Sequence, residues 1–124
     1  MGKKILCIED ERFIGELYTR ALKKAGFEVD IEKDGMNGLK LAQSGDYDVI
    51  LLDIMLPSLN GVELLRKVKG VDVNEQIHSS IIITTNLDQR EDVKKEVEEL
   101  ADGYLIKAEI TPKELVDYVQ KLQI

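Results

Sequence analysis

The sequence predicts an α/β fold: a doubly wound sheet of five parallel strands with helices on both faces. Short apolar runs alternate along the chain with segments whose apolar residues recur at helical spacing. The strongest runs are continuous rather than alternating, which is typical of strands covered on both faces of a parallel sheet. Strands that alternate with helices in this way imply right-handed crossovers and a (βα)5 order.

The strand predictions rest on four strong apolar runs and one weaker run. A strong run such as Val49–Leu52 contains no polar residue. The weaker run, Phe27–Ile31, carries two acidic residues. In chain order, the strands are expected at residues 5–8, 27–31, 49–52, 81–83 and 104–106.

The first three helices follow from apolar residues that share one helical face. Apolar residues recur at i, i+3, i+4 and i+7 over residues 14–25, and Gly26 is a natural stop for this helix. A short second helix is expected over residues 39–42. A third is expected over residues 62–68, with Asn60 as its N-cap.

The last two helices begin with recognisable caps. A capping pattern at Asp88–Glu91 precedes a helix that runs to Leu100. Its apolar stripe is thin and its charges are many, so we expect it to pack loosely and to be able to move. The segment Thr111–Glu114 combines a Thr cap, Pro at the first helical position and Glu at the third, which strongly predicts a helix start.

Length and composition favour one domain over residues 1–124. Hydrophobic residues make up 44% and charged residues 33% of the chain, which is a globular composition. The formal net charge of −7 argues against direct binding of nucleic acid within this chain. A single cysteine cannot form an internal disulfide, and no apolar run approaches the roughly 18 residues of a membrane span. We therefore expect a cytoplasmic protein that binds no membrane.

Polar side chains end four of the predicted strands. The first strand is followed by Glu9–Glu11, the third by Asp53, the fourth by Thr84 and the fifth by Lys107. Ligands of open α/β sheets bind beyond the carboxyl ends of the strands. If these strand ends converge, they place several carboxylates, a hydroxyl and an ammonium group in one pocket.

Such a pocket has the parts for phosphoryl transfer. Crowded carboxylates stay ionised only beside a cation, and oxygen ligands without a thiolate or imidazole cluster indicate Mg²⁺ or a similar hard ion. Lys107 and Thr84 are donors that would hold an anion next to this metal. A metal, a lysine, a hydroxyl and a free carboxylate together suit transfer of a phosphoryl group to Asp53.

These residues resemble a bacterial response-regulator receiver domain over nearly the whole chain. The resembling segments are Ile8–Glu11, Leu52–Pro57 with Gly61, Ile83–Thr85 and Tyr104–Lys107. Each segment alone is weak, but all four in order and at strand ends are highly specific. The resemblance implies a flavodoxin-like strand order, 2-1-3-4-5.

The resemblance also implies residue roles. Asp53 would be the phosphoacceptor, and Lys107 would contact the phosphoryl group. Thr84 would be the hydroxyl that moves toward that group, and Tyr104 the aromatic residue that changes rotamer with it. The resemblance further implies a set of Mg²⁺ ligands and two positions that tune the rate of dephosphorylation. The ligands would be Glu9, Asp10, Asp53 and the Met55 carbonyl oxygen, while Met55 and Asn86 would tune dephosphorylation.

As a receiver, the chain would be a switch rather than a turnover enzyme. A sensor histidine kinase or a small phosphodonor would phosphorylate Asp53, and the chain would promote its own phosphorylation and dephosphorylation. The surface of the fourth helix, fifth strand and fifth helix would then bind an output partner or a second copy. Whether the chain stands alone or is part of a longer regulator stays open.

The sequence departs from the family pattern at three positions. Ala108 follows the lysine where the family usually has proline, so either a costly cis bond is held there or the bond is trans and Lys107 reaches its partner differently. Leu100 stands where a glycine often ends the fourth helix, and Glu9 replaces the commoner aspartate.

Other interpretations stay open at this point. A flavin-binding module would need a phosphate-cradling loop where Glu9–Glu11 stands, and these carboxylates repel phosphate. A phosphatase with an Asp nucleophile would need a second Asp two residues after Asp53, where Met55 stands. A degenerate receiver would act only as an interaction module. The acidic residues after the first strand could also simply cap the first helix.

Overall fold

The computed structural model describes residues 3–54, 61–68, 79–86 and 91–122. Several residues singled out above lie outside these ranges: Met55, Asn60 and Asp88. None of the helices in the described ranges is long and apolar enough for a membrane crossing.

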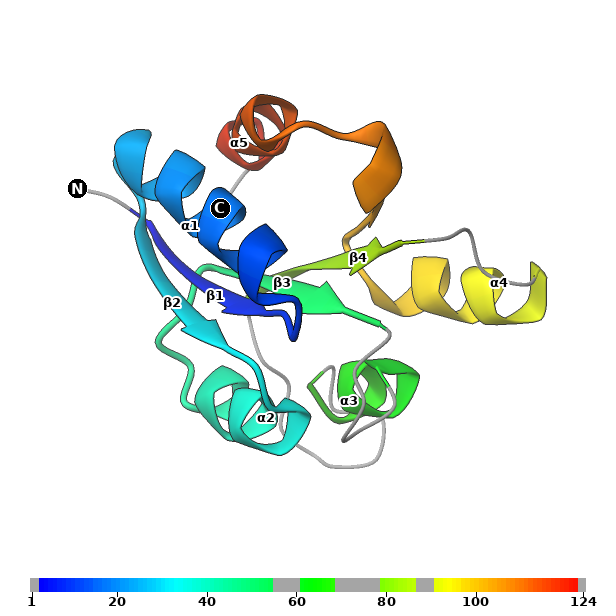
Figure 1. The fold of residues 1–124 in the computed structure, drawn as a ribbon. Coiled ribbons are helices and arrows are strands. Elements are labelled where there is room, and N and C mark those ends of the chain that lie inside the picture. Colours follow the sequence, from blue (N-terminus) through cyan, green and yellow to red (C-terminus); the bar gives the residue numbers. More distant parts are fainter. Residues whose placement is uncertain (1–2, 55–60, 69–78, 87–90, 123–124) are drawn as a thin grey trace.

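One parallel sheet forms the centre of the molecule (Figure 1). Its strands are β1 (Lys4–Ile8), β2 (Glu28–Glu32), β3 (Val49–Asp53), β4 (Ser80–Thr85) and β5 (Gly103–Ile106). They lie in the order β2-β1-β3-β4-β5, and each neighbouring pair is parallel. The predicted fold class and strand order are therefore confirmed.

The helices cover both faces of this sheet. They are α1 (Arg12–Lys24), α2 (Gly35–Gln43), α3 (Gly61–Val68), α4 (Glu91–Leu100) and α5 (Pro112–Gln120). Figure 1 shows α1 and α5 on one face and α2 and α3 on the other, with α4 beside α3. A short 3₁₀ helix, η1 (Lys107–Glu109), joins β5 to α5.

Two apolar cores follow from this layering, one on each side of the sheet. Because side chains alternate along a strand, β1 sends Leu6 and Ile8 into the core beneath α2, α3 and α4. The same strand sends Ile5 and Cys7 into the core beneath α1 and α5. The central strands β1, β3 and β4 are almost entirely buried, as their continuous apolar sequences predict.

The second helix is longer than its apolar residues indicate. It begins at Gly35 because the Asp34 side chain caps it, accepting a hydrogen bond from the Asn37 backbone N–H at 2.9 Å. Gly38 lies so close to β1 that an added Cβ would be 2.9 Å from Ile8 Cδ1. The glycine thus interrupts the apolar pattern but allows the helix to approach the sheet.

The fourth helix contacts its neighbours through the buried Val97 and through polar side chains. Val97 is completely buried, and the Arg66 guanidinium of α3 forms an ion pair with Glu96 of α4. At the other side of α4, the Lys94 ammonium lies 5.7 Å from the centre of the Tyr104 ring of β5. These contacts connect α4 to α3 and to β5.

The predicted helix start at Thr111 is present as a full capping box. Thr111 Oγ1 accepts from the Glu114 backbone N–H at 3.1 Å, and Glu114 Oε1 accepts from the Thr111 backbone N–H at 3.0 Å. The described residues include no cis peptide bond, so the Lys107–Ala108 bond is trans. Of the two possibilities for Ala108, the structure has the trans one.

Candidate functional site

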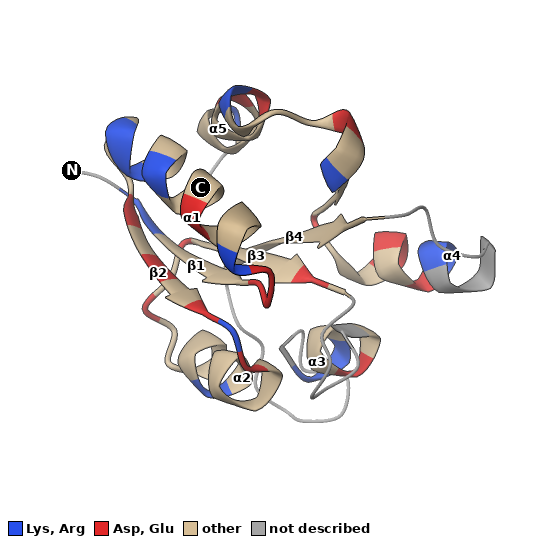
Figure 2. Ribbon diagram, in the orientation of Figure 1, with Lys and Arg blue, Asp and Glu red and all other residues tan. Residues whose placement is uncertain are grey.

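The carboxyl ends of four strands meet at one edge of the sheet. In the strand register, Asp53 lies opposite Thr84 across β3 and β4, and Ile8 lies opposite Leu52 across β1 and β3. Glu9 and Asp10 directly follow Ile8, and Lys107 directly follows β5. Figure 2 shows the acidic loop after β1 beside the acidic end of β3. The convergence predicted from the strand ends is present.

A buried lysine joins two of these carboxylates. Lys107 Nζ donates to Asp53 Oδ2 at 3.1 Å and is in ion-pair contact with Glu9 Oε1. Lys107 is 8% exposed, and Asp53 and Glu9 are each 1% exposed. Lys107 therefore reaches the carboxylates across the end of the sheet although its bond to Ala108 is trans.

The carboxylates of Glu9, Asp10 and Asp53 form a cluster that can hold a metal ion. Each offers an oxygen within 4.8 Å of the others, which suits one hard cation. Glu9 Oε1 is buried and contacts the Lys107 ammonium. This set of carboxylate oxygens, which includes no thiolate or imidazole, fits a hard cation such as Mg²⁺.

The protonation of the cluster reflects its crowding. Burial and then the neighbouring Asp53 raise the pKa of Glu9 to about 7, against the opposing effect of Lys107. Burial and Asp53 also raise the pKa of Asp10. Burial alone would lower the pKa of Lys107, but the Glu9 and Asp53 carboxylates outweigh it and raise that pKa. One ammonium thus stays charged among carboxylates that repel each other.

The predicted switch residues occupy neighbouring strands. Thr84 is buried directly beside Asp53, and its carbonyl oxygen accepts from the Ile54 N–H at 3.1 Å. Tyr104 lies opposite Ile83, half-buried on the edge strand β5. Its ring packs on the core beneath α4 and lies near Lys94. Thr84 is therefore near the carboxylate cluster, and Tyr104 connects β5 to α4.

A further contact at this edge was not predicted. Asn86 Nδ2 donates to Glu11 Oε1 at 2.8 Å, although the two residues are 75 positions apart. Glu11 occupies the N-cap position of α1, yet its side chain makes no capping hydrogen bond. The interpretation that the acidic residues merely cap α1 therefore fails for Glu11. The sequence signal was only that both residues follow strands that end at the same edge.

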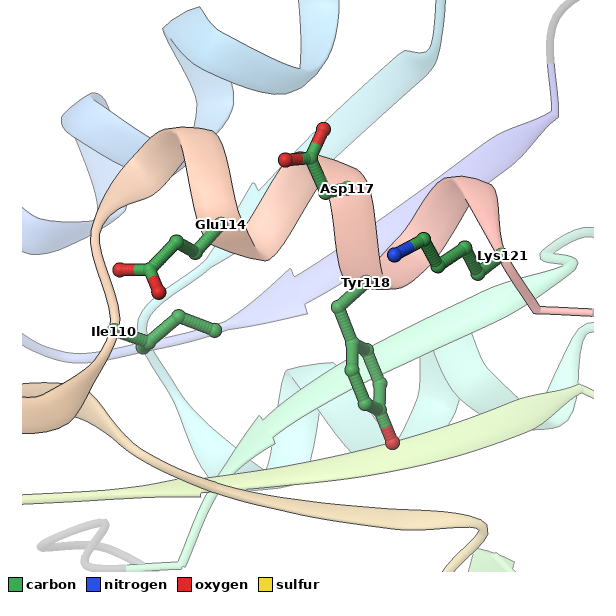
Figure 3. Close-up of a pocket in the computed structure, with 5 residues that line it drawn as sticks. All are labelled: Ile110, Glu114, Asp117, Tyr118 and Lys121. Atoms are coloured by element: carbon green, nitrogen blue, oxygen red, sulfur yellow. The ribbon is translucent and has the colours of Figure 1, made fainter.

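A second feature lies away from the acidic cluster, on α5. A pocket of about 360 Å³ is lined by Ile110, Glu114, Asp117, Tyr118 and Lys121 (Figure 3). Figure 3 shows Tyr118 reaching from α5 toward the strands. A Cβ on Gly103 would be 2.1 Å from the Tyr118 hydroxyl, so only glycine allows this packing. The pocket belongs to the β5–α5 side of the molecule.

Known proteins resemble this chain over most of its length. The model of the response regulator receiver domain matches residues 5–120. The chain is 42% identical over 104 residues to the transcriptional regulatory protein CusR of Escherichia coli strain K12, and 39% identical over 104 residues to the response regulator ArlR of Staphylococcus saprophyticus. Each match covers 84% of this chain but only 44% of CusR and 45% of ArlR, so the chain spans less than half the length of these relatives.

Solved structures agree with the strand order and the layering. A CheY-like receiver domain from Methanospirillum hungatei has a TM-score of 0.86 at 24% identity, covering 98% of this chain and 93% of that one, which is a likeness of fold. The BeF3-activated receiver domain of Klebsiella pneumoniae RstA has a TM-score of 0.79 at 29% identity, covering 94% of this chain and 95% of that one. This chain therefore belongs to the response regulator receiver domains of two-component signalling.

Proposed function

We propose that Asp53 accepts a phosphoryl group from a histidine kinase or a small phosphodonor, and that this switches the surface of α4, β5 and α5. The observation that carries this proposal is the contact of buried Asp53 with the Lys107 ammonium at 3.1 Å, inside the carboxylate cluster. A structural salt bridge would need only one carboxylate, whereas this lysine contacts two of the three. The excess negative charge is the reason to assign the cluster to cation and phosphoryl binding.

The transfer uses Asp53 as the nucleophile. An Asp53 carboxylate oxygen forms a bond to phosphorus while the bond from phosphorus to the donor breaks, and the donor keeps that electron pair. For a phosphohistidine donor, the leaving group is the imidazole. Glu9, Asp10, Asp53 and the Met55 carbonyl oxygen would hold Mg²⁺, which supplies positive charge to the phosphoryl oxygens.

Two residues of neighbouring strands would respond to the new group. Lys107 would exchange its contact with the Asp53 carboxylate for one with a phosphoryl oxygen, because the phosphorylated carboxylate loses its charge. The Thr84 hydroxyl would move toward the same group from the adjacent strand. Tyr104 would change rotamer with it. In this scheme Asn86 and Met55 tune dephosphorylation.

Phosphorylation of Asp53 would change the surface formed by α4, β5 and α5. Tyr104 lies on β5 near Lys94 of α4, so a new rotamer changes a contact between these two elements. The pocket on α5 adds a recess to the same side (Figure 3). This surface would bind an output partner or a second copy of the chain. The proposal includes a partner histidine kinase and a cytoplasmic location. It also treats residues 1–124 as one domain, which binds neither a membrane nor nucleic acid directly.

The test is the intact-protein mass after incubation with acetyl phosphate, with and without Mg²⁺. We expect one phosphoryl adduct that requires both Mg²⁺ and Asp53, and therefore no adduct in Asp53→Asn. Asp46→Asn, at an exposed aspartate before β3, is the matched control and should be modified like the wild type. Binding of beryllofluoride, which mimics the acyl phosphate, should likewise require Asp53.

Two results would contradict the proposal. An adduct that persists in Asp53→Asn would place the acceptor elsewhere. Absence of both the adduct and beryllofluoride binding in the folded wild type would leave a receiver that acts only as an interaction module.

A further inference from the structure

One lysine of α4 lies on the helix face that packs against the sheet. Lys94 stands three residues before Val97, which is completely buried, and seven before Ala101, which packs against the same core. Residues at this spacing share one face of a helix. Lys94 is accordingly half-buried, whereas the next residue, Lys95, is exposed. The ammonium group of Lys94 therefore arises from a face that is otherwise apolar at these positions.

The ammonium of Lys94 lies over the aromatic ring of Tyr104. Its Nζ is 5.7 Å from the ring centre, a distance at which a cation is attracted to the face of a ring. Tyr104 is half-buried on β5, an edge strand of the sheet, and its side chain packs against the core beneath α4. Apolar contacts and a cation therefore both favour the present position of the ring. We call this pair the Lys94–Tyr104 contact.

The Lys94–Tyr104 contact lies two strands away from the proposed phosphoacceptor. Asp53 of β3 lies opposite Thr84 of β4, and Tyr104 of β5 lies opposite Ile83, the residue before Thr84. A rotamer change of Tyr104 that follows phosphorylation of Asp53 would thus take place beside β4 and beneath α4. Such a change moves the ring away from its position under the ammonium. The attraction between the cation and the ring is lost or weakened in that step.

We propose that Lys94 is a positioning residue that holds Tyr104 in the rotamer of the unphosphorylated chain and thereby opposes the switch. A contact that is present in only one of two states shifts the equilibrium toward that state by its own free energy. Lys94 acts through the Tyr104 ring, on which its ammonium lies. This inference rests on the proposed phosphorylation of Asp53 and the proposed rotamer change of Tyr104. It adds the side chain that sets how strongly the change is opposed.

The experiment measures the Kd of beryllofluoride at saturating Mg²⁺ for the wild type and for variants of Lys94. Lys94→Met keeps an unbranched side chain and removes the charge, and we expect it to bind beryllofluoride about two- to fivefold more tightly, the equivalent of one cation–ring contact. A purely electrostatic effect on the bound anion would have the opposite sign. Lys94→Arg keeps a cation over the ring and should retain the Kd of the wild type.

Three further measurements separate the Lys94–Tyr104 contact from a general effect on α4. Lys95→Met makes the same change of charge at the neighbouring exposed lysine, and its Kd should stay near that of the wild type. In a Tyr104→Leu background, which lacks the ring, Lys94→Met should no longer change the Kd. The chain has four tyrosines, so the ring of Tyr104 can be followed by NMR with isotope-labelled tyrosine. Without beryllofluoride, its signal in Lys94→Met should shift toward its position in the complex.

The outcomes separate this inference from the proposed function. If the wild type binds beryllofluoride through Asp53 and Lys94→Met binds it equally or more weakly, Lys94 does not oppose the switch and the function stands. If Lys94→Met still tightens binding in the Tyr104→Leu background, or if Lys95→Met tightens it as much, the effect does not pass through the ring and the inference is wrong. If the wild type does not bind beryllofluoride through Asp53, the proposed function fails first.

Discussion

At the scale of single residues, two side chains, Cys7 and Thr19, carry buried polar groups outside the carboxylate cluster. Cys7 is a free, buried cysteine of β1. Burial and, after it, the nearby Glu9 carboxylate raise its pKa to about 12. The thiol therefore stays protonated at neutral pH. Its burial argues for a packing role.

The Thr19 hydroxyl is expected to lower the free energy of unfolding. Its Oγ1 is buried without a hydrogen-bond partner within the described structure. Thr19→Val keeps the shape, keeps a similar helix propensity and removes the unpaired hydroxyl. We expect the free energy of unfolding in urea to rise by about 1 kcal/mol.

The matched control for Thr19→Val is Thr19→Ser. Serine retains a hydroxyl and loses a methyl group, so this variant should be less stable than the wild type. A valine variant that is less stable than the wild type would mean that the Thr19 hydroxyl has a partner that this structure lacks.

At the scale of single elements, α5 depends on its first turn. The Thr111 hydroxyl satisfies the N–H of Glu114, and the Glu114 carboxylate returns a bond to Thr111. Thr111→Ala removes the cap, and we expect a loss of about 1 kcal/mol in urea unfolding. Lys113→Ala, in the same exposed turn but without a role in the box, should change stability little.

An unchanged stability in Thr111→Ala would show that the packing of Leu115 and Val119 alone holds α5. Both residues are buried in the core shared with α1, so this alternative has a physical basis. A loss that is matched by Glu114→Ala, without additivity in the double variant, would assign the effect to the box.

The sequence predicted best those helix boundaries that depend only on neighbouring residues. The capping box at Thr111 and the stop at Gly26, whose φ is +101°, act within a few neighbouring residues. The length of α2 was underestimated because Gly35 and Gly38 interrupt its apolar pattern. Gly38 is required by the close approach of α2 to Ile8 of β1, which lies outside the helix. The ion pair of Glu96 in α4 is made with Arg66 of α3, which no pattern within α4 could indicate.

For the whole molecule, the topology explains why the candidate site was largely predictable. Parallel strands send their carboxyl ends to one edge, so residues that follow different strands must meet there. Glu9, Asp53 and Lys107 were chosen for that reason, and the structure places them in contact. Which donor pairs with which acceptor could not be predicted, because this depends on loop conformation. The hydrogen bond from Asn86 to Glu11 is the clearest example.

The same crowding predicts how the stability of the whole molecule depends on pH and Mg²⁺. Burial and then Asp53 raise the pKa of Glu9 from 4.5 to about 7, so between these values the folded chain binds a proton that the unfolded chain has released. A state that binds more protons loses stability as pH rises. Without divalent cations, the free energy of unfolding should therefore fall between pH 5 and pH 8, by on the order of 2 kcal/mol.

Mg²⁺ should abolish this decrease in the free energy of unfolding between pH 5 and pH 8. The cation replaces the proton among the carboxylates of Glu9, Asp10 and Asp53, and it binds the folded chain only. Urea unfolding at pH 5 and pH 8, with Mg²⁺ or with EDTA, measures the effect. Glu9→Gln removes the group with the raised pKa, so its stability in EDTA should depend less on pH than that of the wild type. If wild type and Glu9→Gln lose stability equally without Mg²⁺, the pH dependence arises outside the cluster, and Lys107 alone compensates the carboxylates.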